Sequence, residues 1–317
     1  MDFHNPIDEI LGNCILLPTI LANITVIYLS LRHVKSSLMQ KFALNLSIPS
    51  FAFSVYSITV FVLKHVNKSE NLTMEIEIKE NSFLDRTADF ILYVCAYDYQ
   101  LLVILLVAIT YATFAKPIFV KTHIGGWFTH VLFFTCHFSS VVLSIAAMTT
   151  EDQTESIVYG IVPDTIGIDW ADILEAVFFL SSFAVLLTLY TICIIAIVGF
   201  SRRNSILARK SKDRRSIKKQ LLAILAYITP PNVFVIPTTF CIDVLAVLLN
   251  AQTPVFAQVC HVKIIFHDSL MATRLFISSA GILIAFPDYR HALLQIFCKQ
   301  PPAFNRVVMR TISNYPT

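Results

Sequence analysis

Long apolar segments separated by short polar ones dominate the chain. Seven apolar runs lie near residues 10–31, 41–63, 88–112, 125–148, 173–200, 218–248 and 259–286. A membrane-spanning helix needs about 20 mostly apolar residues, and each run meets that length. Backbone groups inside lipid must be satisfied within the segment, so these runs should be helices. The pattern predicts an all-α membrane protein, with one seven-transmembrane helix bundle formed by residues 1–317.

A shorter helix is predicted after the last span. Within residues 288–298, apolar positions recur at helical spacing beside basic ends: Leu293, Leu294, Ile296 and Phe297. This pattern is typical of an amphipathic helix that lies on the membrane surface. Cys298 falls at its end and is a candidate for palmitoylation, with a free, reduced thiol as the alternative.

Composition supports a membrane protein and argues against an enzyme. Hydrophobic residues make up 56% of the chain and charged residues 14%, against about 25% charged in soluble domains. The sequence contains no nucleotide-binding loop, no metal-ligand spacing and no nucleophile motif. We therefore expect that the protein is not an enzyme, binds no cofactor or metal, and has no nucleic-acid partner. His130 and His137 share one helix face without a third ligand nearby, so we interpret them as packing residues.

Basic residues are distributed unevenly although the net charge is only +3. Most Lys and Arg lie in four segments, 32–41, 116–121, 202–219 and 290–310, whereas the other connections are acidic. Lys and Arg are retained on the cytoplasmic side during insertion. The distribution predicts a multi-pass plasma-membrane protein with an extracellular amino terminus and a cytosolic carboxy terminus. The first apolar segment has no basic flank before it, so we expect a retained helix and not a signal peptide.

The loop expected at 64–87 would then lie outside. It contains two glycosylation sequons, at Asn67 and Asn71, which predicts a glycoprotein. Two further cysteines, Cys241 and Cys260, flank the last outer loop, and whether they pair stays open.

Three prolines fall in the sixth predicted span: Pro230, Pro231 and Pro237. Proline removes a backbone donor and bends a helix, so these residues are candidates for a hinge. The alternative is that they are simply tolerated, as proline often is in membrane helices.

Charged residues inside predicted spans are costly and usually functional. The candidates for a ligand pocket are in the third and seventh spans: Asp89, Asp98, His267, Asp268 and Arg274. Two interpretations compete. Arg274 forms a structural pair with Asp98 or Asp268, or these side chains line a polar ligand cavity.

Several short motifs match a known receptor pattern. Asn23 lies where rhodopsin-like receptors have a first-helix asparagine, and Asn45-Leu-Ser47 is similar to the start of their second-helix motif. Thr110-Tyr111 with Pro117 resembles the end of their third helix. The segment Ile284-Ala-Phe-Pro-Asp-Tyr-Arg290 resembles the seventh-helix ending of nematode serpentine chemoreceptors, a divergent branch of the G-protein-coupled receptor superfamily.

The chain departs from mainstream rhodopsin-like receptors at three motifs. Ser50 replaces the second-helix Asp, Ile109-Thr110 replaces Asp-Arg, and Ser278-Ser279 stands in place of the seventh-helix Asn-Pro. The cysteines of the usual loop disulfide are missing. The departures favour the nematode chemoreceptors, which relax these motifs.

The resemblance implies a chemosensory receptor that binds a small extracellular ligand and signals to a cytosolic heterotrimeric G protein. The candidate coupling residues lie at the end of the third span, in the following loop and at the start of the sixth: Thr110, Tyr111, Pro117, Arg214, Arg215, Lys218 and Lys219. A membrane transporter or ligand-gated channel subunit is the alternative. An insect-type ligand-gated chemoreceptor would place the amino terminus inside, against the charge pattern.

Overall fold

The computed structural model describes residues 6–35, 37–69, 74–115, 120, 127–158, 170–203, 212–233 and 266–298. Its helices are α1 (Pro6–Arg32), α2 (Leu38–Ser69), α3 (Met74–Ala115), α5 (Trp127–Val158), α6 (Trp170–Arg203), α7 (Lys212–Val233), α11 (His267–Ala285) and α12 (Pro287–Cys298). The described ranges contain no strand, so the predicted all-α class is confirmed for them.

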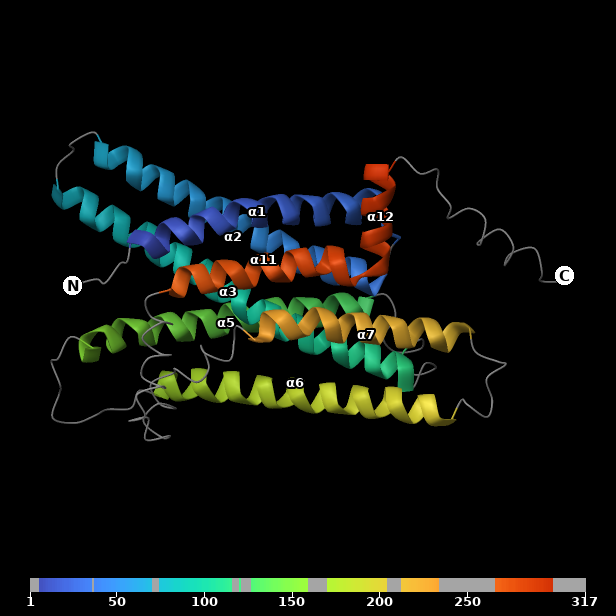
Figure 1. The fold of residues 1–317 in the computed structure, drawn as a ribbon. Coiled ribbons are helices and arrows are strands. Elements are labelled where there is room, and N and C mark those ends of the chain that lie inside the picture. The colour runs from blue at the N-terminus through green and yellow to red at the C-terminus, as the bar shows by residue number, and fades with distance from the viewer. Residues whose placement is uncertain are drawn as a thin grey trace.

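The long helices pack side by side, and successive helices run in opposite directions (Figure 1). The central helix is α3, which contacts α2, α5, α6 and α7, while α1 packs against α2 and α11. Between α11 and α12 the chain bends by 82°, so α12 crosses one end of the bundle. We call this the α12 end, and the opposite end, where α1 begins and α2 finishes, the cavity end.

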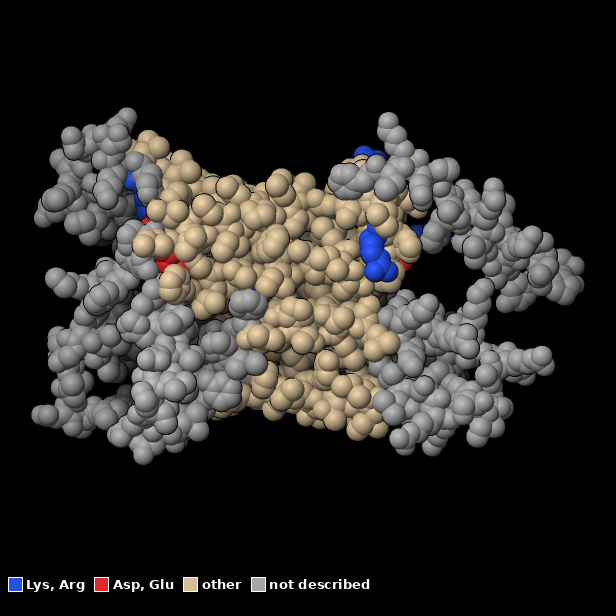
Figure 2. Space-filling view, in the orientation of Figure 1, with Lys and Arg blue, Asp and Glu red and all other residues tan. Residues whose placement is uncertain are grey.

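Four described helices are long and apolar enough to cross a membrane: Ile7–Arg32, Leu38–Lys64, Arg86–Thr113 and Trp127–Met148. The described apolar parts of α6 and α7 are shorter, at Leu180–Ala196 and Leu222–Val233. A broad band without Lys, Arg, Asp or Glu separates the two charged ends of the molecule in Figure 2. The chain is thus a helical membrane protein, and its full number of seven spans stays a prediction.

Two helices extend well beyond the apolar segments that predicted them. The expected loop at 64–87 is largely helical, because α2 continues to Ser69 and α3 starts at Met74. That expectation was wrong for a simple reason. Hydropathy marks only the part of a helix inside lipid, while residues 64–87 contain no Gly or Pro to stop a helix and several Glu and Lys that favour one.

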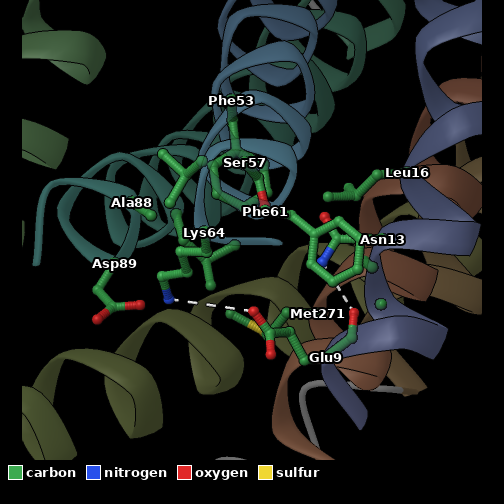
Figure 3. Close-up of a pocket in the computed structure, with 14 residues that line it drawn as sticks. Glu9, Asn13, Leu16, Phe53, Ser57, Phe61, Lys64, Ala88, Asp89 and Met271 are labelled. Atoms are coloured by element: carbon green, nitrogen blue, oxygen red, sulfur yellow. Dashed lines mark hydrogen bonds and ion pairs between the residues drawn. The ribbon is translucent and has the colours of Figure 1, made fainter. Parts of the chain in front are cut away.

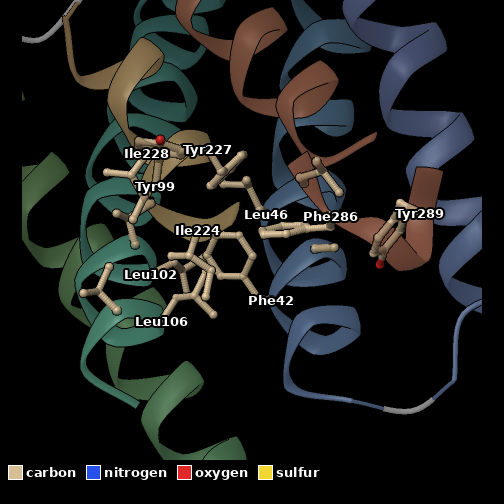
Figure 4. Packing of buried hydrophobic residues seen from close by; sticks show 14 of the residues in the cluster. Phe42, Leu46, Tyr99, Leu102, Leu106, Ile224, Tyr227, Ile228, Phe286 and Tyr289 are labelled. Carbon is tan, nitrogen blue, oxygen red and sulfur yellow. The ribbon is translucent and has the colours of Figure 1, made fainter. Parts of the chain in front are cut away.

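Aromatic side chains fill the interior at the α12 end (Figure 4). The Phe42 ring lies edge-on to Tyr227, with centroids 5.9 Å apart, and to Phe286, at 6.5 Å. Gly281 allows α11 to approach this cluster, because a Cβ atom there would lie 3.0 Å from Cδ2 of Tyr227. Close helix contact at a small residue is a usual way to pack membrane helices.

The position of α12 is set by a buried hydrogen bond to the first helix. The Tyr289 hydroxyl lies 2.6 Å from Ser30 Oγ, and Gln40 Nε2 donates to the Ser30 carbonyl at 2.6 Å. Leu294 and Ile296 are exposed on the same helix as the exposed Arg290. These contacts agree with an amphipathic helix whose buried residues hold it against α1.

Candidate functional site

A cavity of about 130 Å³ opens between α1, α2, α3 and α11 at the cavity end (Figure 3). Its walls include polar and apolar side chains: Glu9, Asn13, Phe53, Lys64, Asp89 and Met271. Phe53, Leu16 and Leu92 are mostly buried, so the deeper walls are apolar. A partly apolar cavity with a few polar groups is the usual form of a small-molecule site.

The charged groups of this cavity lie near its mouth. Lys64 Nζ is 4.0 Å from Glu9 Oε1, and the Glu9 carbonyl accepts a hydrogen bond from Asn13 Nδ2 at 2.8 Å. Figure 3 places Asp89 beside Lys64, across the cavity from α1. The structure therefore places Asp89, a predicted pocket residue, in the wall of the cavity.

The first helix also fixes the start of α11. Asp8 is buried, and its Oδ1 accepts hydrogen bonds from the Ser269 hydroxyl and from the Ser269 backbone amide, the latter at 3.1 Å. The first amides of a helix have no partner within it and favour negative charge. A carboxylate from α1 thus caps a helix 261 positions further along the chain and holds one wall of the cavity in place.

Arg274 lies directly beneath this cavity. It lines a small internal space of about 10 Å³, and Leu92 and Met271 line both spaces. Its side chain is 5% exposed, with Nη2 3.5 Å from the Ala96 carbonyl and the guanidinium 5.2 Å from the centre of the Tyr99 ring. Within the described residues, Arg274 forms no ion pair, and Nε has no hydrogen-bond partner.

Asp98 pairs with a histidine and not with Arg274. Asp98 Oδ1 is 2.8 Å from His137 Nδ1, so the interpretation of His137 as a packing residue was wrong. Of the two acids suggested as partners of Arg274, Asp98 is engaged with His137, and the side chain of Asp268 lies outside the described part. Asp98 points toward α5 and Arg274 packs against the α11-facing side of α3. Successive residues of an α-helix are rotated by about 100°, so Asp98 on α3 faces another neighbour than Ala96 and Tyr99, which contact Arg274. Assigning a residue to a span does not show which neighbouring helix it faces.

The pair continues to α2. His137 Nε2 lies 2.9 Å from Asn45 Oδ1, and Asn45 Nδ2 donates to the Lys41 carbonyl at 2.7 Å. Because an amide oxygen only accepts, Nε2 carries a proton. Asp98 on α3, His137 on α5 and Asn45 on α2 thus join three helices.

A second polar group joins α1, α2 and α11. Asn23 Nδ2 donates to Ser50 Oγ at 3.0 Å, and the Ser279 hydroxyl donates to Asn23 Oδ1 at 2.8 Å. All three side chains are buried. Ser50 and Ser279, at two motif positions where the chain differs from the receptor pattern, therefore both bond to Asn23 of the first helix.

The residues predicted to contact a G protein have different surroundings. Thr110 is buried with 5% exposure, and Tyr111 is partly buried against the α12-end core. A space of about 270 Å³ near them is lined by Lys41, Thr113 and Thr129. Arg214, Arg215, Lys218 and Lys219 lie in the first turns of α7, and their side chains are outside the described part, as is Pro117. In this conformation Thr110 is not part of an exposed surface.

The other predicted residues are placed only in part. Helix α7 continues through Pro230 and Pro231 to Val233, and Pro237 lies outside the described residues. Asn67 is in the last turn of α2, and Asn71 is not described. His267 and Asp268 begin α11 and Cys298 ends α12, but the structure does not describe their side chains.

No protein-family model matches this sequence, and no curated protein matches it significantly. The described residues contain no group of His, Cys, Asp or Glu arranged to hold a metal ion. His137 and Asn45 are the main residues that sequence reasoning missed. The rule that an intramembrane acid needs a partner would have pointed to His137, an ionisable residue in a neighbouring span.

Proposed function

We propose that this protein is a seven-helix chemosensory receptor that binds a small ligand in the cavity and signals to a heterotrimeric G protein. The observation that carries the proposal is the position of the cavity, at the end of the bundle opposite α12 and bounded by four helices. In this arrangement the cavity end faces outside, and the α12 end, with Arg32, Lys35 and Lys41, faces the cytosol.

A receptor also needs a mechanical link between the two ends. Two polar groups supply candidates, because Asn23 joins α1, α2 and α11, while the Asp98–His137 pair joins α3 and α5. A ligand that changes the spacing of α1, α3 and α11 would bias the packing at the far end. Such coupling typically amounts to about 1–3 kcal/mol.

The proposal is tested by reconstitution. The full chain in nanodiscs is mixed with purified heterotrimeric G proteins of each class, and nucleotide exchange is measured during a screen of small odorant molecules. We expect at least one ligand to accelerate exchange with one G-protein class. Ligand-evoked current in a planar bilayer without G protein would instead favour the channel or transporter alternative.

Matched charge variants separate coupling from topology. Replacing Arg214, Arg215, Lys218 and Lys219 with Gln should leave ligand binding intact and reduce exchange. The control replaces Arg202, Arg203, Arg209 and Lys210 with Gln, which removes the same charge from the start of the same basic segment. Equal exchange by the two variants at equal protein concentration in nanodiscs would contradict a coupling role for the start of α7.

A further inference from the structure

Arg274 is a buried cation whose charge is not balanced by any acid in the described residues. The described acids nearest in the bundle have other contacts: Asp8 with Ser269, Glu9 with Lys64, and Asp98 with His137. Asp89 lies in the wall of the upper cavity and forms no ion pair with Arg274 in the described structure. Within the described residues, the Ala96 carbonyl lies 3.5 Å from Nη2, and the Tyr99 ring lies 5.2 Å from the guanidinium. A carbonyl or an aromatic ring stabilises a guanidinium cation less than a bound anion would.

Physical chemistry makes this arrangement incomplete. A charge buried in an apolar environment is costly unless it is paired and hydrogen-bonded. The guanidinium is planar with five donors and forms strong charge-assisted hydrogen bonds with a carboxylate. With Nε free of any partner in the described structure, Arg274 presents a donor that such an anion would use.

The space around Arg274 and the cavity above it share two lining residues. Met271 lies one turn before Arg274 on α11, and Leu92 lies one turn before Ala96 on α3, and both residues line the two spaces. The lower space, about 10 Å³, has room for about one water molecule. That space is large enough for one carboxylate oxygen, with the rest of the molecule in the upper cavity.

We propose that Arg274 anchors an anion-binding site whose occupant is a small organic anion, in the simplest case a monocarboxylate. Its carboxylate pairs with Arg274, and its apolar body packs against Leu16, Phe53, Leu92 and Met271. This proposal rests on the proposed function in one respect, that the bound anion is the signalling ligand. Anion binding itself is measured without any G protein.

The test uses the full chain in nanodiscs and follows its thermal unfolding. Hexanoate and benzoate are titrated at constant ionic strength, and hexanamide and benzamide serve as neutral analogues of the same shape. Sodium chloride, balanced with a bulky anion, forms a third series. We expect the carboxylates to raise the midpoint of unfolding saturably, and the amides to have no effect. A saturable response to chloride alone would support the anion site and identify an inorganic occupant.

Three variants complete the experiment. Arg274→Gln should bind carboxylates at least about tenfold more weakly, because it loses a charge-assisted contact, and Arg274→Lys should keep part of the response. Arg290→Gln, which removes an exposed arginine from α12, is the control and should bind like wild type. Without anion, Arg274→Gln should be at least as stable as wild type, since it removes an unbalanced buried charge.

Two results would overturn the proposal. One is a carboxylate response that is equal in wild type and Arg274→Gln. The other is the absence of any anion response together with a loss of stability in Arg274→Gln, which would assign Arg274 a structural pair. Failure of the receptor proposal has a different outcome, in which carboxylates bind through Arg274 but no G protein is activated.

Discussion

At the α12 end, side chains from α2, α3 and α7 fill the interior around Phe286, whereas at the cavity end the space between α1, α2, α3 and α11 is left partly open. Phe42 is fully buried in a cluster of edge-on rings. Phe53, eleven residues later on the same helix, has the same chemistry but borders the cavity. One helix thus contributes to a packed core at one end and to a cavity wall at the other.

The difference shows where this bundle is expected to be rigid and where it can adapt. Membrane helices associate largely through van der Waals contacts. Atoms that line a void lack those contacts on one side. The α12 end is therefore expected to supply most of the stability. The cavity end has its helices held by a few polar contacts, such as Asp8 with Ser269, and has room for a ligand.

The largest expected effect is from Phe42→Ala, which should lower the free energy of unfolding by about 3–5 kcal/mol because it leaves a large void in a packed cluster. Phe53→Ala is the matched variant at the other end and should cost about half as much, since one side of that ring already borders free space. Reversible unfolding in mixed micelles measures both. Equal losses would mean that the two ends are packed alike.

The Asp98–His137 pair should give the next largest effect. A double-mutant cycle of Asp98→Asn and His137→Gln should yield a coupling free energy of about 1.5–3 kcal/mol, the range for hydrogen bonds to charged groups. The same unfolding assay applies. Asp98→Asn combined with Arg274→Gln is the control cycle, and a larger coupling there would reverse the pairing described here.

Gly281→Ala tests how tightly α11 fits the packed end. The added methyl group would lie 3.0 Å from the Tyr227 ring, so we expect a loss of about 1–3 kcal/mol through overpacking. In a Tyr227→Leu background, which removes the ring, the same substitution should be nearly neutral. If Gly281→Ala costs as much in that background, the loss has a source other than this contact.

The smallest effect is expected at the mouth of the cavity. Lys64→Gln removes a partly exposed ion pair with Glu9 at 4.0 Å, and such pairs contribute about 0–1 kcal/mol. Stability should therefore change little, while binding of ligands that contact the mouth should change. A loss of stability comparable to that of Phe42→Ala would show that the cavity end is stabilised by charge pairing.

Much of the fold follows from the sequence because insertion into lipid depends on local composition. A run of about 20 apolar residues inserted in lipid is expected to be a helix, and the runs at 10–31, 41–63, 88–112 and 125–148 therefore predicted spans. The structure has long apolar helices there, at Ile7–Arg32, Leu38–Lys64, Arg86–Thr113 and Trp127–Met148. The short helix after the last span was also predicted, from the amphipathic pattern within residues 288–298. The extent of α2 and α3 beyond the apolar part was not, because hydropathy carries no information on helices in water.

The sequence also identified which residues are chemically unusual in the membrane, including Asp89, Asp98 and Arg274. Only the tertiary structure decided what each of them contacts: Asp89 borders the cavity, Asp98 meets His137, and Arg274 lies beneath the cavity. The physical reason is that the cost of burying a charge is a property of the residue and its depth. Its partner depends on how neighbouring helices are rotated and shifted against one another, which packing across the whole bundle determines.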